Sequence, residues 1–385
     1  MSASLWGASL RRLVHEVPRA VVLPRRGRPD PWLLLAVALL LGLGWVLVLN
    51  ATYFRAAAQG DPLLFARRHT ISLATGVGLA FLAARIRVDA WQRYARGLLF
   101  LTVAFLLLVL LAPIGQERGG ARRWLAYGPL SFQPAEMAKL TLTLYLARFL
   151  SLRPAGARDL VADVLPTLTM AGIVATLVLV QPDFGTSMIL LATAMGLLFA
   201  AGTPLWFFAS LATSAALVAS AAVWMAPYRM RRVLCFVDPW QDPRGDCFQL
   251  VQSLLSFGVG SWWGVGLGES RQKLFFLPEA HTDFIFALVG EELGLVGVGA
   301  VVLLFVMLTV RGFRVAYRET DPFAHYLALG LTLSLALEAV LNMGVVLGML
   351  PTKGLVLPFV SYGGSALWFS LVRVGILLNL SRRAG

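Results

Sequence analysis

An aspartate stands where the longest polar stretch of the chain meets an apolar run, within the sequence LPEAHTDFIF at 277–286. An ionisable side chain that enters a membrane is a functional hypothesis by default, and the carboxylate of Asp283 is able to act as a general base on a sugar hydroxyl. Burial beside Phe284 and Phe286 would raise its pKa, whereas the start of a helix would lower it. The alternative is that Asp283 or Thr282 only caps the following helix.

A second set of polar side chains lies in the sequence GARRW at 120–124. Arg122 or Arg123 would hold a phosphate group through charge-assisted hydrogen bonds, and Trp124 would stack on a sugar ring. The alternative is an aromatic residue of the membrane interface with ordinary flanking charges.

The sequence QPAEMAK at 133–139 predicts the start of a helix, because Pro134 suits the first helical position and Glu136 suits the first turn. Glu136 and Lys139 are three residues apart and share one face of that helix. We expect them in a polar cluster at the outer mouth of a cavity. The alternative is an ion pair that only stabilises the helix start.

One cation, Lys353, lies among glycine and proline in the sequence GMLPTKG at 348–354. Glycine-rich backbone approaches an anion closely, and lysine binds phosphate as a point charge. The same pattern also fits a plain turn between two helices.

Four further charges fall inside apolar runs. Glu291 and Glu292 follow Asp283 by eight and nine residues on the same expected helix, about 12–13 Å deeper. Glu338 and Arg373 lie at similar depths in the next two apolar runs, and we expect them to form an intramembrane ion pair with a structural role.

The composition sets the class of protein that must position these side chains. The chain has 385 residues, of which 58% are hydrophobic and 14% are charged, whereas a soluble domain carries about a quarter charged residues. The sequence therefore predicts an all-α integral membrane protein. The net charge of +13 indicates cytoplasmic loops or a phosphate-bearing ligand, and a nucleic-acid partner is not expected.

Ten apolar runs are long enough to be transmembrane helices. They cover about 32–50, 70–86, 97–114, 135–151, 163–181, 184–201, 204–226, 283–311, 324–350 and 362–381.

The basic residues predict the orientation of these helices. With both termini in the cytoplasm, 18 of the 33 Lys and Arg residues fall inside and 14 fall outside, many of them in two outer loops. Residues 1–30 form a basic cytoplasmic tail, and 31–385 form the membrane domain with a large outer loop at about 227–282. Cys235 and Cys247 lie in that loop and form either a disulfide or two buried free thiols.

Taken together, these motifs resemble the FtsW/RodA family of shape, elongation, division and sporulation proteins. Ala280 and the sequence PTKG at 351–354 are more similar to FtsW than to RodA. Glu338 departs from the family pattern, which has a neutral amide there, and Ser261 replaces a glycine. The matching segments are GARRW at 120–124, QPAE at 133–136, QPDFGT at 181–186, DPW at 238–240, LPEAHTDFIF at 277–286, NMGV at 342–345, LPTKG at 350–354 and SYGGS at 361–365.

The resemblance implies ten spans, cytoplasmic termini, a large outer loop between the seventh and eighth spans, and a place in the bacterial cytoplasmic membrane. It implies a peptidoglycan glycosyltransferase that polymerises lipid II on the outer face, with Asp283 as the catalytic residue. The motifs require no cofactor, although a divalent cation, Mg²⁺ or Mn²⁺, could share the neutralisation of the pyrophosphate leaving group. The substrate-binding set would be Arg122, Arg123, Trp124, Glu136, Lys139, His281, Lys353 and Ser361.

The resemblance also implies partners, namely a class B penicillin-binding transpeptidase and other membrane proteins of cell division. Three alternatives remain at this point: a lipid II flippase, an elongation-type polymerase similar to RodA, and a scaffold without chemistry. The crowding of polar groups in the outer half favours surface catalysis. The charges at Glu291, Glu292, Glu338 and Arg373 keep the flippase alternative open.

Overall fold

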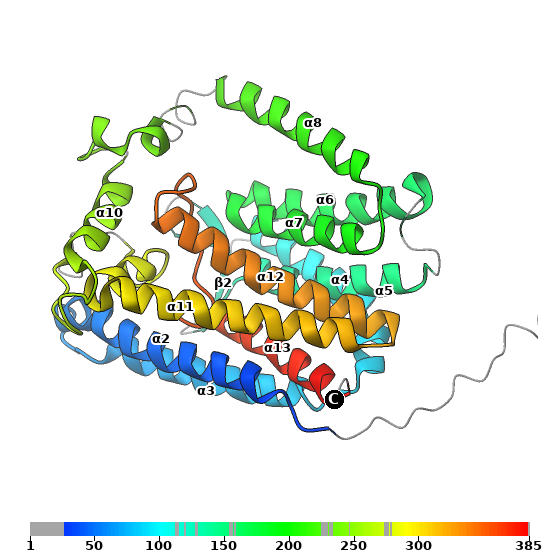
Figure 1. Cartoon of the computed structure of the whole chain (residues 1–385), viewed down its shortest axis with the longest axis horizontal. Coiled ribbons are helices and arrows are strands. Elements are labelled where there is room, and N and C mark those ends of the chain that lie inside the picture. The colour runs from blue at the N-terminus through cyan, green and yellow to red at the C-terminus, as the bar shows by residue number, and fades with distance from the viewer. Residues whose placement is uncertain are drawn as a thin grey trace, which may run out of the picture.

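The computed structural model describes residues 27–111, 115–118, 121–127, 130–153, 157, 159–224, 230, 234–245, 247–272, 277 and 279–383. Residues 1–26 of the predicted basic tail at 1–30 lie outside these residues. The described chain is mostly helical (Figure 1). Its helices are α2 (Pro31–Ala57), α3 (Leu64–Ala83), α4 (Val88–Leu111), α5 (Pro134–Ser151), the π-helix η1 (Leu160–Val164), α6 (Leu165–Val180), α7 (Phe184–Ala200), α8 (Leu205–Trp224), the 3₁₀ turn η2 (Pro239–Gln241), α10 (Phe248–Gly260), α11 (Ile285–Arg318), α12 (Pro322–Val346) and α13 (Gly364–Ser381).

Each of the ten apolar runs overlaps one of these helices. Within the described residues, six helices are apolar and long enough to cross a membrane, namely α2, α4, η1 with α6, α11, α12 and α13. The other four runs correspond to α3, α5, α7 and α8. Among these, α5 carries Glu136, Lys139 and Arg148, and these charges lower its hydropathy. The chain is therefore a helical multi-pass membrane protein.

Helices α5 and α12 occupy the centre of the bundle. Helix α12 contacts α5, α7, α11 and α13, whereas α2 and α3 cover α11 and α13 on one side (Figure 1). Nearly every side chain of α5 between Pro134 and Leu144 is buried. Helix α8 leaves the bundle at the upper edge of the view. The polar residues of α5 and α12 therefore face protein, and each needs a partner there.

The two ends of the described chain meet at one end of the bundle, which we call the tail end. Gly27 N donates to Arg382 O over 3.1 Å. Asp30 caps α2 by accepting from Trp32 N and Leu33 N, and its carboxylate pairs with Arg311 over 2.5 Å. The opposite end holds the start of α11 and is called the site end.

A small antiparallel sheet at the site end corrects the all-α prediction. Its strands are β1 (Gly115–Arg118), β2 (Ala121–Tyr127) and β3 (Leu130–Phe132), in the order β1-β2-β3. Gln116 pairs with Trp124, and Ala126 pairs with Ser131. The strands are too short for their alternation to stand out beside the charges, yet the pairing satisfies the backbone polar groups of this loop.

The segment between α8 and α11 contains short helices, as predicted for the large outer loop. A disulfide joins Cys235 to Cys247, the residue before α10, so the free-thiol alternative is wrong. Helix α11 is broken at Gly294, whose φ is 63°. The backbone of 261–266 replaces the lost helical hydrogen bonds, because Leu295 N donates to Ser261 O and Val265 N donates to Glu291 O, each over 2.9 Å.

Candidate active site

Asp283 lies in a turn at 279–284 that leads into α11. The residue at the cap position of α11 is Phe284, and its side chain makes no capping hydrogen bond. Thr282 Oγ1 donates to the backbone and side-chain oxygens of Glu279 instead. Neither residue named in the capping alternative therefore caps the helix, and within the described part of the chain the Asp283 carboxylate accepts no hydrogen bond.

The turn places the Asp283 carboxyl group in a partly buried position between three charged side chains. Burial raises the pKa of Asp283 to about 7, and the negative charges of Glu279 and Asp183 act in the same direction, against the opposing effect of Arg123. A carboxyl group with a pKa near the working pH is suited to general base catalysis. The upward shift expected from burial is therefore the dominant effect on the pKa of Asp283.

Arg123 on β2 holds the turn between α6 and α7. Its Nε donates to Gln181 O over 3.0 Å, and its Nη2 donates to Pro182 O. The guanidinium thus caps carbonyls at the end of α6 while its positive charge faces Asp283. Asp183, in the same turn, is buried and caps α7 by accepting from Thr186 N over 3.1 Å.

Lys353 lies beside the start of α7. Its Nζ is 3.0 Å from the centre of the Phe184 ring, which is a cation–π contact. The next residue, Gly354, passes over the carboxylate, because a Cβ atom added there would lie 2.9 Å from Asp283 Oδ2. The loop between α12 and α13 therefore passes over the Asp283 carboxylate at Gly354 and carries Lys353 beside the start of α7.

Ser361 and His281 hold the turn at 279–284 in place. Ser361 is buried, and its Oγ donates to Thr282 O over 2.5 Å and accepts from Leu357 N over 2.8 Å. His281 is also buried and packs edge-on against Phe65. Burial lowers the pKa of His281, so its ring is neutral at physiological pH. Both side chains are thus engaged by protein groups behind the turn.

Arg122 and Trp124 lie on β2 on either side of Arg123. The side chain of Arg122 is exposed and that of Trp124 is half-buried. The sheet that contains them contacts α5 and α4 at the site end.

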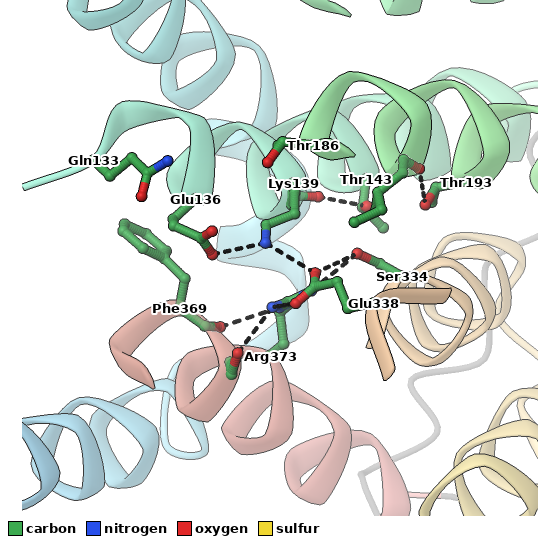
Figure 2. A network of polar contacts seen from close by, with 12 residues as sticks. Gln133, Glu136, Lys139, Thr143, Thr186, Thr193, Ser334, Glu338, Phe369 and Arg373 are labelled. Carbon is green, nitrogen blue, oxygen red and sulfur yellow. Dashed lines mark hydrogen bonds and ion pairs between the residues drawn. The ribbon is translucent and has the colours of Figure 1, made fainter. Parts of the chain in front are cut away.

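Glu136 and Lys139 lie in a buried ion network rather than beside Asp283 (Figure 2). Lys139 Nζ is 2.7 Å from Glu136 Oε2 and 3.1 Å from Glu338 Oε1. Glu338 pairs in turn with Arg373 through two contacts of 2.6 and 3.1 Å, which confirms the expected intramembrane ion pair. Ser334 and other neighbours on α12 and α13 accept the remaining guanidinium hydrogens. Two acids and two bases thus balance one another inside the bundle.

Glu291 and Glu292 also have protein partners. Glu291 accepts from Arg271 N over 2.9 Å and from Ser270 Oγ, and Glu292 accepts from Asn50 Nδ2 over 2.6 Å. Glu291 thus fastens the segment at 270–271 to α11, and Glu292 joins α11 to α2.

The family model described as Cell cycle protein, FTSW_RODA_SPOVE, matches residues 31–385. This chain belongs to the FtsW/RodA/SpoVE family.

Family members with curated names are similar along nearly the whole chain. A protein of Halorhodospira halophila named probable peptidoglycan glycosyltransferase FtsW is 47% identical over 98% of this chain and 91% of its own length. A protein with the same name from Nitrosococcus halophilus is 44% identical over 92% of each chain.

Solved structures of the family share the fold. A chain in a structure described as the structural coordination of polymerization and crosslinking by a peptidoglycan synthase complex is 34% identical, with a TM-score of 0.78 over 92% of this chain and 98% of that one. The rod shape determining protein RodA of Thermus thermophilus is 28% identical, with a TM-score of 0.67 over 92% and 97%.

Within the described residues of this family member, no three His, Cys, Asp or Glu side chains come together as a metal-binding cluster. The divalent cation stays a prediction, and no chemical step below is assigned to one.

Sequence reasoning did not single out Asn342 and Asp183 as site residues, although both lie in the matching motifs. Asn342 Nδ2 donates to Asp283 O over 2.9 Å, and Asp183 faces the same carboxyl group. An asparagine one helical turn from Glu338 in an apolar run was the available signal, because a polar side chain inside a span needs a partner.

Proposed function

We propose that this chain is an FtsW-type peptidoglycan glycosyltransferase that polymerises lipid II on the outer face of the cytoplasmic membrane, with Asp283 as its general base. The activity agrees with the names of relatives that are 47% and 44% identical over nearly all of the chain. The observation that carries the catalytic assignment is the Asp283 carboxylate, which has a raised pKa and no hydrogen bond within the described residues.

The proposed step transfers one glycan unit. Asp283 takes the proton of the acceptor's sugar hydroxyl, and the oxygen attacks the anomeric carbon of the donor. The bond between that carbon and the phosphate oxygen breaks, and undecaprenyl pyrophosphate leaves with the electron pair. Cations near the donor stabilise the negative charge that develops on the leaving group.

Lys353 and Arg123 are the proposed pyrophosphate contacts, because both lie on segments that meet at Asp283. Arg122 on the same strand would extend this positive surface, and Trp124 would stack on a sugar. Glu136, Lys139, His281 and Ser361 act indirectly in this proposal, because each is buried and occupied by protein partners. They shape the site and do not touch the substrate.

The membrane arrangement in this proposal has ten spans, with the site end outside and both termini in the cytoplasm. The seventh and eighth spans are α8 and α11, and the large outer loop lies between them. A class B penicillin-binding transpeptidase is the proposed partner, because a relative 34% identical to this chain belongs to a complex that couples polymerisation to crosslinking. The division role follows the FtsW names of the relatives.

The four charged residues on which the flippase alternative depended have contacts that indicate a structural role. Glu291 and Glu292 accept hydrogen bonds from neighbouring segments, and Glu338 and Arg373 pair with each other. A transport path through the bilayer would need polar groups available to the passing headgroup.

Glycan synthesis from purified lipid II tests the proposal. The full chain and its transpeptidase partner are reconstituted in liposomes, and polymer length is compared between the natural sequence and Asp283→Asn. We expect the natural sequence to make polymer and Asp283→Asn to make none, although the variant is still folded and bound to its partner. Normal polymer from Asp283→Asn would remove Asp283 from the mechanism, and lipid II transport without polymer would favour the flippase.

A further inference from the structure

The backbone around Asp283 is held by donors from the end of α12 and from the segment before α13. Three consecutive carbonyl oxygens of the catalytic turn each receive one hydrogen bond. The donors are Tyr362 N to His281 O at 3.0 Å, Ser361 Oγ to Thr282 O at 2.5 Å, and Asn342 Nδ2 to Asp283 O at 2.9 Å.

Asn342 differs from the other two donors because its amide holds two segments at once. The same Nδ2 atom also donates to Leu355 O over 2.5 Å. Leu355 follows Lys353 and Gly354 in the loop that carries the proposed pyrophosphate contact. One amide group therefore joins the backbone of the catalytic carboxylate to the backbone of the loop that bears the cation.

The loop at Gly354 lies close to the Asp283 carboxylate. Gly354 has no side chain, and a Cβ atom there would lie 2.9 Å from Asp283 Oδ2. A small shift of the loop would therefore either crowd the carboxylate or move Lys353 away from it. The Asn342 amide fixes that separation from behind, on the rigid helix α12.

The buried amide of Asn342 lowers the stability of the folded state. Asn342 is 1% exposed, and its Oδ1 atom has no hydrogen-bond partner among the residues that the structure describes. A buried polar oxygen without a partner destabilises a fold, and each such atom in a native protein calls for an explanation. A leucine would fill the same space in an apolar helix without this cost, so the amide donor indicates a role beyond packing.

We propose that Asn342 is a positioning residue for glycan transfer, whose single amide sets the Asp283 carboxylate and the Lys353 loop in register with each other. This inference rests on the proposed polymerase function. Asn342 acts through the backbone of both segments and does not touch the reacting atoms.

The test compares three variants of the full chain in liposomes that contain lipid II. Asn342→Leu keeps the volume and removes both hydrogen bonds, and Asn342→Asp keeps the shape and loses the donor. Asn379→Leu is the matched control, because Asn379 Nδ2 also donates to a backbone carbonyl, Ile86 O, at the tail end. Initial rates of polymer synthesis at several lipid II concentrations separate kcat from KM.

We expect Asn342→Leu and Asn342→Asp to lower kcat by about 10-fold or more, with KM changed by less than about 3-fold. The control should leave both constants unchanged. A rise in KM with kcat preserved would mean that Asn342 serves substrate binding, and it would overturn the inference.

The pH profile is a second readout that a purely structural role would not move. Asp283 is faced by Glu279 in its own turn, by Asp183 before α7 and by Arg123 on β2, and Lys353 lies on the neighbouring loop. A loosened turn admits water to the carboxylate, so the pH of half-maximal kcat should fall in Asn342→Leu by about half a unit or more. An unchanged midpoint with a normal rate would overturn the inference.

The outcomes separate this inference from the proposed function. If the natural sequence makes no polymer, the proposed function fails. If it makes polymer and Asp283→Asn makes none, but both Asn342 variants match the control, only the positioning role fails. If neither Asn342 variant yields folded protein while the control does, the amide serves the fold, and the positioning role is again overturned.

Discussion

The buried ion network and the turn that carries Asp283 both contact helix α12, but their charged side chains differ in how they are paired. In the network, Glu338 pairs with both Arg373 and Lys139, and every member is buried. At the turn, the carboxylate of Asp283 has charged neighbours but no hydrogen bond within the described residues, and its pKa is raised to about 7. The difference teaches that the paired charges serve the packing of the bundle, whereas the proposed general base is the carboxylate that has no hydrogen bond among the described residues.

The largest effect should come from breaking the charge balance of the network. Arg373→Met leaves Glu338 with one cation in place of two, and removing one partner of a buried ion pair costs about 3–5 kcal/mol. The double variant Arg373→Met with Glu338→Leu leaves the balanced pair of Glu136 and Lys139. We expect far more folded protein from the double variant than from Arg373→Met, measured as monodisperse protein after detergent extraction. Equal yields would contradict the structural role of this ion pair.

A smaller loss is expected when the proposed pyrophosphate contact is removed. Lys353→Gln should lower kcat about 10- to 100-fold, because stabilisation of the leaving-group charge is lost. The yield of folded protein should not change. Arg87→Gln is the matched control, since Arg87 forms an exposed pair with Asp89 at the tail end. Full activity of Lys353→Gln in the lipid II assay would exclude a contact between Lys353 and the substrate.

The pH dependence of polymerisation should follow Asp283. A general base must be ionised, so the rate rises with pH and is half-maximal at about pH 7. Arg123 favours the ionised form, and Arg123→Gln should move the midpoint to higher pH. Glu279 opposes ionisation, and Glu279→Gln should move the midpoint to lower pH. Rate profiles of the three proteins check these directions, and shifts of the same sign in both variants would contradict them.

The smallest effect concerns Ser261, which replaces a glycine of the family pattern. Its φ of 49° and ψ of −140° lie in a region that glycine adopts easily and that costs other residues about 1–3 kcal/mol. Ser261→Gly should therefore stabilise the protein by about 1 kcal/mol, seen as a higher midpoint of thermal unfolding. A lower midpoint would mean that the serine makes a compensating contact.

Much of the bundle could be predicted from the sequence because apolar runs of bilayer length report helices directly. The helix start at Pro134 and the pair of Glu338 with Arg373 follow from local rules and from the cost of buried charge. The sheet at 115–132 could not be predicted, because its strands are too short for their alternation to be recognised. The break at Gly294 could not be predicted either, because it is stabilised by backbone partners at 261–266, in an earlier part of the chain.

The candidate site was predictable only in part. Asp283 stood out because of its place at the start of an apolar run. The position of Lys139 away from the site could not be predicted, because a single sequence does not reveal that the Lys139 ammonium on α5 points inward toward Glu338. Asn342 was hidden for a similar reason, because its two acceptors are backbone carbonyls 59 and 13 residues away along the chain.

Thermal unfolding of Asp283→Asn, measured beside its polymerase activity at about pH 8, tests the central claim most directly. Because burial and neighbouring acids raise the pKa of Asp283 from 3.8 to about 7, the folded state loses stability as the pH rises between these two values, and the full loss is present at pH 8. The neutral amide should therefore stabilise the protein by at least about 1 kcal/mol while polymerisation falls by about 100-fold or more. A destabilised Asp283→Asn variant would show that the carboxylate serves the fold, and an active one would remove Asp283 from the mechanism. Either result would contradict the account.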